Sequence, residues 1–363
     1  MIPLKEKISP FHLAMLVFMS QIGIGIFTLP RELADHYGTN GWLFLFVCLA
    51  ISTFNIYLIS LVFRLGRGRS LFEIFEKSIS KVVLYPGYVV IASIWAVFGC
   101  VIAKKYILLF QMIAFPTTNP MGLKLAIDIL AYFLLVKGIY NISKSATLFF
   151  WIAIWMWPLL LLFFPEFEWL RLTPFLLKGG HDMLKGGIDI YTSYMGYELS
   201  ILLFPYIDQR KKPMLAIYSG NAFLTVIYVS LSLLCFGIFS FGQLKNLLFP
   251  LLDIQAMIHF PFIERLENLL YGFYLFLILI TLVMYLWSAQ EAVFRITRKA
   301  KSKVYIIIAF GLTYGISSIP KTLDQVNVWI TYLGYAVTAI GFGLPIVAIF
   351  VLLLQRKGGE LHA

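Results

Sequence analysis

Charged residues are scarce in this sequence: 13% of its 363 residues are Asp, Glu, Lys or Arg, against 60% hydrophobic residues. The mean hydropathy is +0.86. A soluble globular protein of this size does not need so much apolar surface, so these values predict an all-α membrane protein that crosses the bilayer many times. Acidic residues are fewer than basic residues, and the net charge is +11. In a membrane protein this excess is typical of basic cytoplasmic loops, so we expect the lipid bilayer as a partner and no nucleic acid.

Cysteines and catalytic motifs are also lacking. The three cysteines lie inside apolar runs, and their spacing fits neither a disulfide framework nor a metal site. The five histidines are scattered, and the sequence contains no nucleotide-binding loop, no Gly-x-Ser-x-Gly and no His-Glu-x-x-His. The sequence therefore predicts no enzyme, no catalytic residue, no metal ion and no cofactor.

Long apolar stretches fill most of the chain, and a transmembrane helix needs about 20 such residues. Ten spans are predicted, at residues 10–33, 40–63, 84–115, 121–139, 144–165, 184–207, 214–241, 263–296, 303–319 and 327–354. We expect them to form a single transmembrane domain over residues 1–363. The first span is expected to be retained and not cleaved as a signal peptide, because no small-residue cleavage site follows it.

The basic residues set the expected orientation. With the N-terminus in the cytoplasm, most of them fall on the inside, so both termini are expected in the cytoplasm. Two connections are more than turns. Residues 70–81 have the pattern of a short amphipathic helix on the cytoplasmic surface, and residues 242–262 that of an outer loop with short helices. Plain connecting structure is the alternative for both.

The middle of the first span has a low propensity to form a helix. Residues 20–30 read Ser-Gln-Ile-Gly-Ile-Gly-Ile-Phe-Thr-Leu-Pro, and both Gly and Pro disfavour a regular helix. Gly23 and Gly25 would point roughly 200° apart, so they do not form one flat packing face. The pattern favours a local break whose backbone groups face a cavity. The alternative is a glycine-facilitated kink that binds no ligand.

The sixth span repeats this pattern. Its centre contains Tyr194, Gly196, Tyr197 and the charged Glu198, and Pro205 follows. Interrupted segments at corresponding positions of two halves are typical of transporters built from inverted repeats. We therefore predict a 5+5 inverted repeat with broken helices one and six. The two repeats would cover about residues 10–165 and about residues 184–354.

Several of these segments resemble known membrane proteins. Residues 23–27 (GIGIF) and 195–198 (MGYE) resemble the glycine-rich break and the Gly-aromatic-Glu element of the amino acid–polyamine–organocation superfamily, which has the LeuT-like fold. Residues 21–31 (QIGIGIFTLPR) and 262–267 (FIERLE) resemble segments of one branch, the B subunits of bacterial spore germinant receptors. This resemblance implies an A subunit and a lipid-anchored C subunit as partners, and the inner membrane of the spore as the location.

The two breaks are the predicted ligand site. A half-helix that starts near Ile26 would present N–H groups to a carboxylate, and one that ends near Gln21 would present carbonyls to an ammonium group. An α-amino acid carries both groups on one carbon, and the resembled superfamily uses its first and sixth helices in this way. The predicted ligand-binding residues are Gly23, Ile24, Gly25, Val101, Tyr194, Gly196, Tyr197, Thr281 and Ser288.

Three charged residues are predicted inside the membrane. An ionised Glu198 would cost roughly 2.5–3.5 kcal/mol at mid-membrane, so we expect it to face the bundle interior. Its role would be to anchor the helix, to gate through protonation or to contact the ligand. Lys104 and Lys105 point about 100° apart, and one of them would pair with Glu198. Alternatively, the third span is shifted and one lysine reaches the membrane interface.

Spans three and eight supply the remaining candidates. Thr281, Tyr285 and Ser288 share one helix face, where their hydroxyls would line the cavity, coordinate an ion or bond to their own helix. Val101 and Phe98 would shape the pocket around a ligand side chain or simply pack. Sodium-independent relatives often carry a lysine in the fifth span, and residues 146–163 contain none, so ion coupling stays open.

The favoured function is a receptor subunit that senses a small nutrient, most simply an amino acid, and triggers germination. A secondary transporter of amino acids or polyamines is the main alternative, because a fold does not determine a function. A third candidate is an ion or water conduit opened by the ligand, with Glu198 and the intramembrane lysines along its path.

Overall fold

The computed structural model describes residues 7–173, 177–258 and 266–360. Within these ranges the chain is helical, apart from one isolated parallel bridge between Ile8 and Ile207. The main α-helices are α1 (Pro10–Gln21), α2 (Leu29–Tyr37), α3 (Phe44–Leu65), α4 (Leu71–Glu76), α5 (Lys81–Ala114), α6 (Pro120–Val136), α7 (Ile139–Ile154), α8 (Met156–Leu159), α9 (Met183–Thr192), α10 (Pro213–Ile238), α11 (Phe241–Asn246), α12 (Pro250–Ala256), α13 (Leu266–Ile296), α14 (Lys303–Ser317) and α15 (Leu323–Glu360). Short 3-10 helices, η1 to η6, join several of them.

Six helical segments are long and apolar enough to cross a membrane, which makes this a multi-pass membrane protein. They are Gly41–Leu65, Lys81–Ala114, Ile139–Glu166, Pro213–Ile238, Leu266–Ile296 and Leu323–Arg356. The other four predicted spans fall on shorter or interrupted helices. Helix α6 has 17 residues and α14 has 15. Residues 10–37 and 183–206 are each divided by a stretch that is not α-helical.

The first interruption lies at the predicted glycines. Helix α1 begins with Ser9 as its cap, and it ends at Gln21 because Ile22 and Gly23 adopt extended backbone. A single 3-10 turn, η1 (Ile24–Phe27), leads into α2. Pro30 is tolerated because its missing N–H group falls in the first turn of α2. The sequence thus located this break to within a residue or two.

The second interruption lies at Gly196. Helix α9 ends at Thr192, and the chain turns before it continues as the 3-10 helix η5 (Tyr197–Tyr206). Gly196 has a φ of +126°, which side-chain-bearing residues rarely adopt. A Cβ atom at this position would also overlap the backbone carbonyl of Ser20 in α1. The two interruptions are therefore in direct contact with each other.

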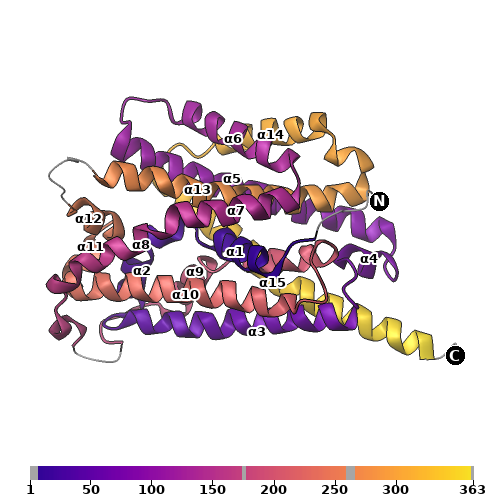
Figure 1. Ribbon diagram of the computed structural model, residues 1–363, viewed down its shortest axis with the longest axis horizontal. Helices are drawn as coiled ribbons and strands as arrows, with labels where there is room; N and C mark the ends of the chain where they lie inside the picture. The colour runs from indigo at the N-terminus through magenta and orange to yellow at the C-terminus, as the bar shows by residue number, and fades with distance from the viewer. Residues whose placement is uncertain (1–6, 174–176, 259–265, 361–363) are drawn as a thin grey trace.

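The long helices pack around α1. Helix α1 contacts α7, α10 and α13, while α5 runs along α13 and α15 contacts both α3 and α5. Most long helices follow one general direction, with α4 and the end of α15 at one end of the molecule and α11 and α12 at the other (Figure 1). Large apolar side chains such as Phe133, Trp151 and Leu312 are more than half exposed on the outside. An apolar outer surface of this kind fits contact with lipid.

The two connections that were predicted to be helical differ in outcome. Residues 70–81 contain only the six-residue helix α4, and Leu71 and Ile74 are buried where it contacts α5 and α15. This helix is therefore docked on the protein, and its place on the cytoplasmic surface stays a prediction. Short helices are confirmed in the other connection, as α11 and α12. Residues 259–265, which include the first four residues of the FIERLE segment, lie outside the described residues.

Candidate functional site

A cavity of about 290 Å³ lies where the two interruptions meet. Its wall comes from the first break and α2, from α5, from the end of α9, and from α13 and α15. It extends from the buried breaks to the exposed side chain of Asn327. This volume suits a small molecule. Four of the predicted ligand-binding residues line it: Gly23, Ile24, Gly25 and Thr281.

The first break presents backbone to this cavity. Gly23 and Gly25 are partly exposed, whereas Ile24 between them is buried. Within the described chain, no backbone carbonyl accepts a hydrogen bond from the N–H groups of these three residues. N–H groups at the start of a helical segment that reach no backbone carbonyl carry partial positive charge and favour an anion. This stretch of backbone can therefore bind a carboxylate.

The two glycines of the first break have different surroundings. A Cβ atom at Gly25 would lie 2.5 Å from Ser193 Oγ and 3.1 Å from Ser193 Cβ. A Cβ atom at Gly23 would meet only the carbonyl oxygen of Gln21, at 3.8 Å, within the 4 Å considered. Gly25 therefore allows the second break to approach, while Gly23 leaves free space inside the cavity.

Gln21 connects the two breaks, a role that the sequence did not reveal. Its Nε2 donates hydrogen bonds to the Tyr194 carbonyl at 2.8 Å and to Asn221 Oδ1 at 2.9 Å. The Tyr228 hydroxyl lies 3.2 Å from the Ser193 carbonyl and 3.5 Å from that of Gln21. Several carbonyls at the two breaks thus already have protein donors, and fewer remain for a ligand ammonium than the sequence predicted. The sequence feature that could have predicted this role is an amide side chain next to a glycine break, deep in a membrane span.

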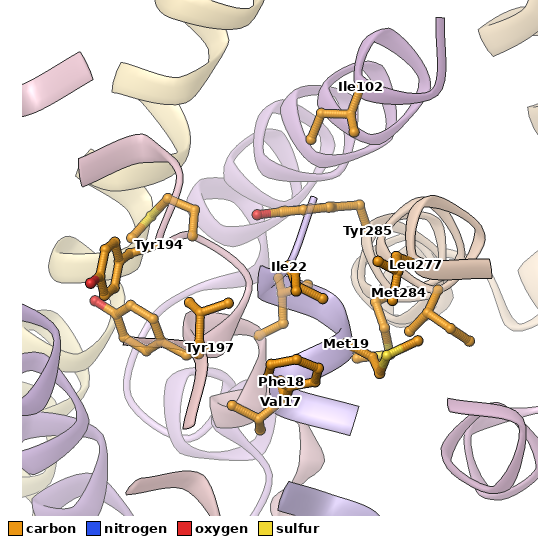
Figure 2. Close-up of a cluster of buried hydrophobic side chains, with 14 of the residues drawn as sticks. Val17, Phe18, Met19, Ile22, Ile102, Tyr194, Tyr197, Leu277, Met284 and Tyr285 are labelled. Carbon is orange, nitrogen blue, oxygen red and sulfur yellow. The ribbon is translucent and has the colours of Figure 1, made fainter. Parts of the chain in front are cut away.

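Glu198 is buried behind Tyr285 and does not line the cavity. Its Oε1 accepts a hydrogen bond from the Tyr285 hydroxyl at 3.0 Å, and its Oε2 accepts one from the Gly196 N–H at 2.5 Å. Figure 2 shows Tyr285 extending from α13 toward the segment that carries Tyr194 and Tyr197. The predicted pairing of Glu198 with an intramembrane lysine is therefore wrong, because a tyrosine and a backbone N–H hold this carboxylate.

Lys104 and Lys105 point in different directions from α5. Lys104 Nζ lies 3.1 Å from Met121 Sδ in α6, a helix that also holds the buried ion pair between Lys124 and Asp128. Lys105 is 7% exposed and lines the cavity. Successive helix residues differ by about 100°, so only one of two neighbours faces a given partner. The structure thus brings Lys105, and not Lys104, to the candidate site.

The three hydroxyls predicted on one face of α13 have separate environments. Thr281 lines the cavity, and its Oγ1 lies 3.3 Å from the Met19 carbonyl and 3.3 Å from the Leu277 carbonyl of its own helix. Tyr285 lines the cavity and bonds to Glu198. Ser288 is fully buried and is not part of the cavity wall. Of these three residues, only Thr281 and Tyr285 therefore belong to the cavity wall.

The α5 residues considered for pocket shape divide in the same way. Phe98 and Ile102 line the cavity. Val101 is fully buried and packs against Val326 of α15, outside the cavity wall. The helix rotation that brings Phe98, Ile102 and Lys105 to the cavity turns Val101 away from it.

The predicted tyrosines of the second break hold the surrounding helices. Tyr194 donates a hydrogen bond to the Leu45 carbonyl at 3.1 Å. The Tyr197 hydroxyl lies 2.6 Å from that of Tyr191 and accepts from Asn55 Nδ2 at 2.9 Å. Neither Tyr194 nor Tyr197 lines the cavity. In this structure they fix the second break against its neighbours, including α3.

Charged residues that the sequence analysis did not select line the outer part of the cavity. They are Arg31, Glu32, Asp35 and His36 of α2 and Asp189 of α9. Asp35 lies 3.3 Å from Lys245 Nζ in α11 and 3.6 Å from His181 Nε2. Asp189 accepts a hydrogen bond from Tyr335 at 2.5 Å. The sequence feature that could have predicted these wall residues is a run of ionisable residues at the end of an otherwise apolar span.

The far side of the breaks is closed by packing and backbone pairing. The Ile8 N–H donates a hydrogen bond to the Tyr206 carbonyl at 2.9 Å, and the Asp208 N–H donates to the Ile8 carbonyl at 3.4 Å. Ile8 and Phe204 are almost completely buried. The cavity therefore opens on the side of α2, toward the end of the molecule that holds α11 and α12 (Figure 1).

The chain is similar to known spore germination proteins. A family model described as spore germination protein matches residues 7–326. Spore germination protein GerQB of Bacillus cereus is 23% identical over 339 residues, which cover 92% of this chain and 93% of that protein. Spore germination protein A2 of Bacillus subtilis (strain 168) is 25% identical over 362 residues, which cover 97% of each chain.

A solved transporter structure shares the fold. It is Mhp1, a nucleobase-cation-symport-1 family transporter, in a closed conformation with bromovinylhydantoin bound. The TM-score is 0.67 and the identity 12%, with 95% of this chain and 78% of that chain covered. At this identity the likeness concerns the fold alone, which is transporter-like. With the family match over residues 7–326, the chain belongs to the spore germination protein family, a family of permease- and receptor-type membrane proteins and not an enzyme class.

Proposed function

We propose that this protein is the ligand-sensing membrane subunit of a spore germinant receptor, and that the cavity between the breaks binds a small nutrient, most simply an amino acid. The observation that carries the proposal is the backbone of Gly23, Ile24 and Gly25 at the wall of this cavity, whose N–H groups donate to no backbone carbonyl in the described chain. Binding would favour one arrangement of the half-helices over another. Such a shift requires a ligand with different affinities for the two states.

The proposed architecture is ten spans in a 5+5 inverted repeat. Residues 10–37 and 183–206 would be the broken first and sixth spans, and α6 and α14 would complete the set with the six long segments. The distribution of basic residues supports cytoplasmic termini. Under this orientation the cavity opens to the outer side of the membrane, where a nutrient would arrive.

The proposed partners are an A subunit and a lipid-anchored C subunit, in the inner membrane of the spore. Support comes from family membership and from relatives that are named as germination proteins. Affinity purification of the tagged protein from spore membranes tests this proposal. We expect both partner subunits to co-purify, and their absence under mild solubilisation would contradict it.

A secondary transporter remains the second candidate, because the fold is shared with a symporter. Reconstitution into liposomes separates the two functions. A sensor subunit binds radiolabelled amino acid without sustained uptake, whereas a transporter accumulates it. Steady uptake in the absence of partner subunits would contradict a function limited to sensing.

A ligand-opened conduit is the third candidate. It would require Tyr285 to release Glu198, because their hydrogen bond now separates this carboxylate from the cavity. Planar-bilayer recording tests it: a conduit gives conductance that depends on added amino acid and is lost in Glu198→Gln. Absence of any amino-acid-dependent current would exclude this function for the subunit alone.

A further inference from the structure

Lys105 places a basic side chain in the wall of the ligand cavity. The residue is 7% exposed, and the cavity is bounded by its side chain. Among the described residues, none lies within hydrogen-bond or ion-pair distance of Lys105 Nζ. A buried charge without a partner is costly, and ionisable residues inside membranes usually mark the path or site of a ligand.

Among the described residues, no carboxylate of the cavity wall lies at ion-pair distance from Lys105. Asp35 is engaged by a lysine and a histidine outside the cavity wall, and Asp189 accepts the hydrogen bond of a tyrosine. Glu32 remains, half-buried on α2, and interacts with Lys105 electrostatically at a distance beyond an ion pair. Arg31 is the second cation of the wall. The acidic residues of the wall offset its basic residues overall, but none of them lies at ion-pair distance from Lys105, so a ligand carboxylate at this point would supply the partner that Lys105 lacks among the described residues.

We propose that the ligand carries a second acidic group on its side chain, and that Lys105 binds this group. The inference rests on the proposed function, in which the α-carboxylate occupies the N–H groups between Gly23 and Gly25. A small dicarboxylic amino acid is the ligand class that meets both requirements. A neutral zwitterion would leave Lys105 without a partner, whereas a side-chain carboxylate would form a charge-assisted hydrogen bond with it.

The other α5 residues at the cavity fit such a ligand. Phe98 and Ile102 line the wall at positions seven and three residues before Lys105, so the three share one helix face. Their apolar side chains would contact the methylene groups of the ligand, while Lys105 binds the terminal acid. Lys105 is thus a specificity-determining residue, separate from the backbone that would bind the shared α-carboxylate.

The neighbouring lysine provides a matched control. Lys104 is buried on the same helix, but its Nζ contacts Met121 Sδ of α6 and it does not line the cavity. Lys104→Met and Lys105→Met therefore remove the same charge from adjacent positions. Only the second substitution removes a group that faces the ligand.

Calorimetric binding to the full-length protein in lipid nanodiscs tests the inference with L-glutamate, L-aspartate, L-alanine and succinate as probes. The wild type should bind the two acidic amino acids more tightly than alanine. Lys105→Met should weaken their binding by about 10- to 100-fold, as expected for a lost charged hydrogen bond, and leave alanine binding unchanged. Lys104→Met should leave the preference for acidic amino acids intact. If Lys105→Met unfolds, as judged by thermal melting, Lys105→Arg and Lys105→Gln replace it, and only the arginine should retain the preference.

Two results would overturn the role of Lys105 while leaving the proposed function in place. One is tighter binding of alanine than of glutamate by the wild type. The other is equal weakening of both ligands in Lys105→Met, which would indicate a structural effect. Absence of binding by every amino acid would instead overturn the proposed function. In that case, binding of succinate that depends on Lys105 would still support an acid-binding site at this residue. If succinate does not bind either, both the proposed function and the role of Lys105 are overturned.

Discussion

Replacing Gly23 by alanine tests whether a ligand contacts the broken backbone without disturbing the protein itself. The new methyl group would have the Gln21 carbonyl oxygen as its nearest protein atom, at 3.8 Å, and would occupy free space in the cavity. Gly23 has φ −113° and ψ −158°, an extended conformation that alanine can adopt. Gly→Ala changes at compatible positions stabilise proteins by about 0.4–1 kcal/mol through the unfolded chain. We therefore expect the thermal stability of Gly23→Ala to be unchanged or slightly higher.

Ligand affinity should fall in the same variant. A carboxylate bound to the N–H groups of residues 23–25 must approach this backbone closely, and the methyl group would block that approach. Loss of one hydrogen bond to a charged group corresponds to about 1.5–3 kcal/mol. The loss of that free energy raises the dissociation constant by about 10- to 100-fold.

Thermal unfolding and amino acid binding should be measured on the same nanodisc preparation. Gly343→Ala in α15 is the matched control, because a Cβ atom there also meets nothing within 4 Å and the residue does not line the cavity. The control should retain wild-type affinity. Wild-type affinity in Gly23→Ala as well would refute the assignment of this backbone as the ligand's receptor.

Three further predictions concern the contacts between the breaks. Gly25→Ala should lose ligand binding and melt at a lower temperature, and adding Ser193→Gly should restore the melting temperature but not the binding, because it removes the overlapping side chain. Recovery of binding in this double variant would show that Gly25 serves packing alone. Gly196→Ala should lower the free energy of unfolding by about 1–3 kcal/mol, measured by chemical denaturation, because its φ of +126° is strained for alanine; wild-type stability would contradict this. Glu198→Ala should be less stable than Glu198→Gln by about 1–3 kcal/mol, since only glutamine can still bond the Gly196 N–H and Tyr285, and equal stabilities would argue against these hydrogen bonds.

The breaks were predictable because they depend on local backbone chemistry. Glycine and proline weaken the interior of a helix through local backbone chemistry, so Gly23, Gly25 and Gly196 located both interruptions without any knowledge of packing. The contact between the breaks was not predictable in this way. It depends on Gln21, whose side chain reaches groups 173 and 200 residues away in the chain, and sequence order carries no signal for such a partner.

The rotation of each helix was harder to predict than its position. Val101 and Phe98 are both apolar, so hydrophobicity does not distinguish the residue that lines the cavity from the one that packs against α15. Lys104 and Lys105 pose the same problem with two identical charges. The predicted partner of Glu198 was wrong because charge complementarity favoured a lysine, whereas the hydroxyl of Tyr285 donates a hydrogen bond to this carboxylate in the folded protein.

The most direct test of the central claim is the accessibility of the cavity to a thiol reagent. The native cysteines Cys48, Cys100 and Cys235 are fully buried, so a cysteine introduced at Thr331, in the cavity wall, can be labelled selectively. Labelling rates with a membrane-impermeant maleimide should be measured with and without each standard amino acid except cysteine, whose own thiol consumes the reagent, with Thr322→Cys as an exposed control outside the cavity. If the cavity is the ligand site, at least one amino acid slows labelling at position 331 and none slows it at position 322. Equal rates at position 331 with and without every amino acid would contradict the claim.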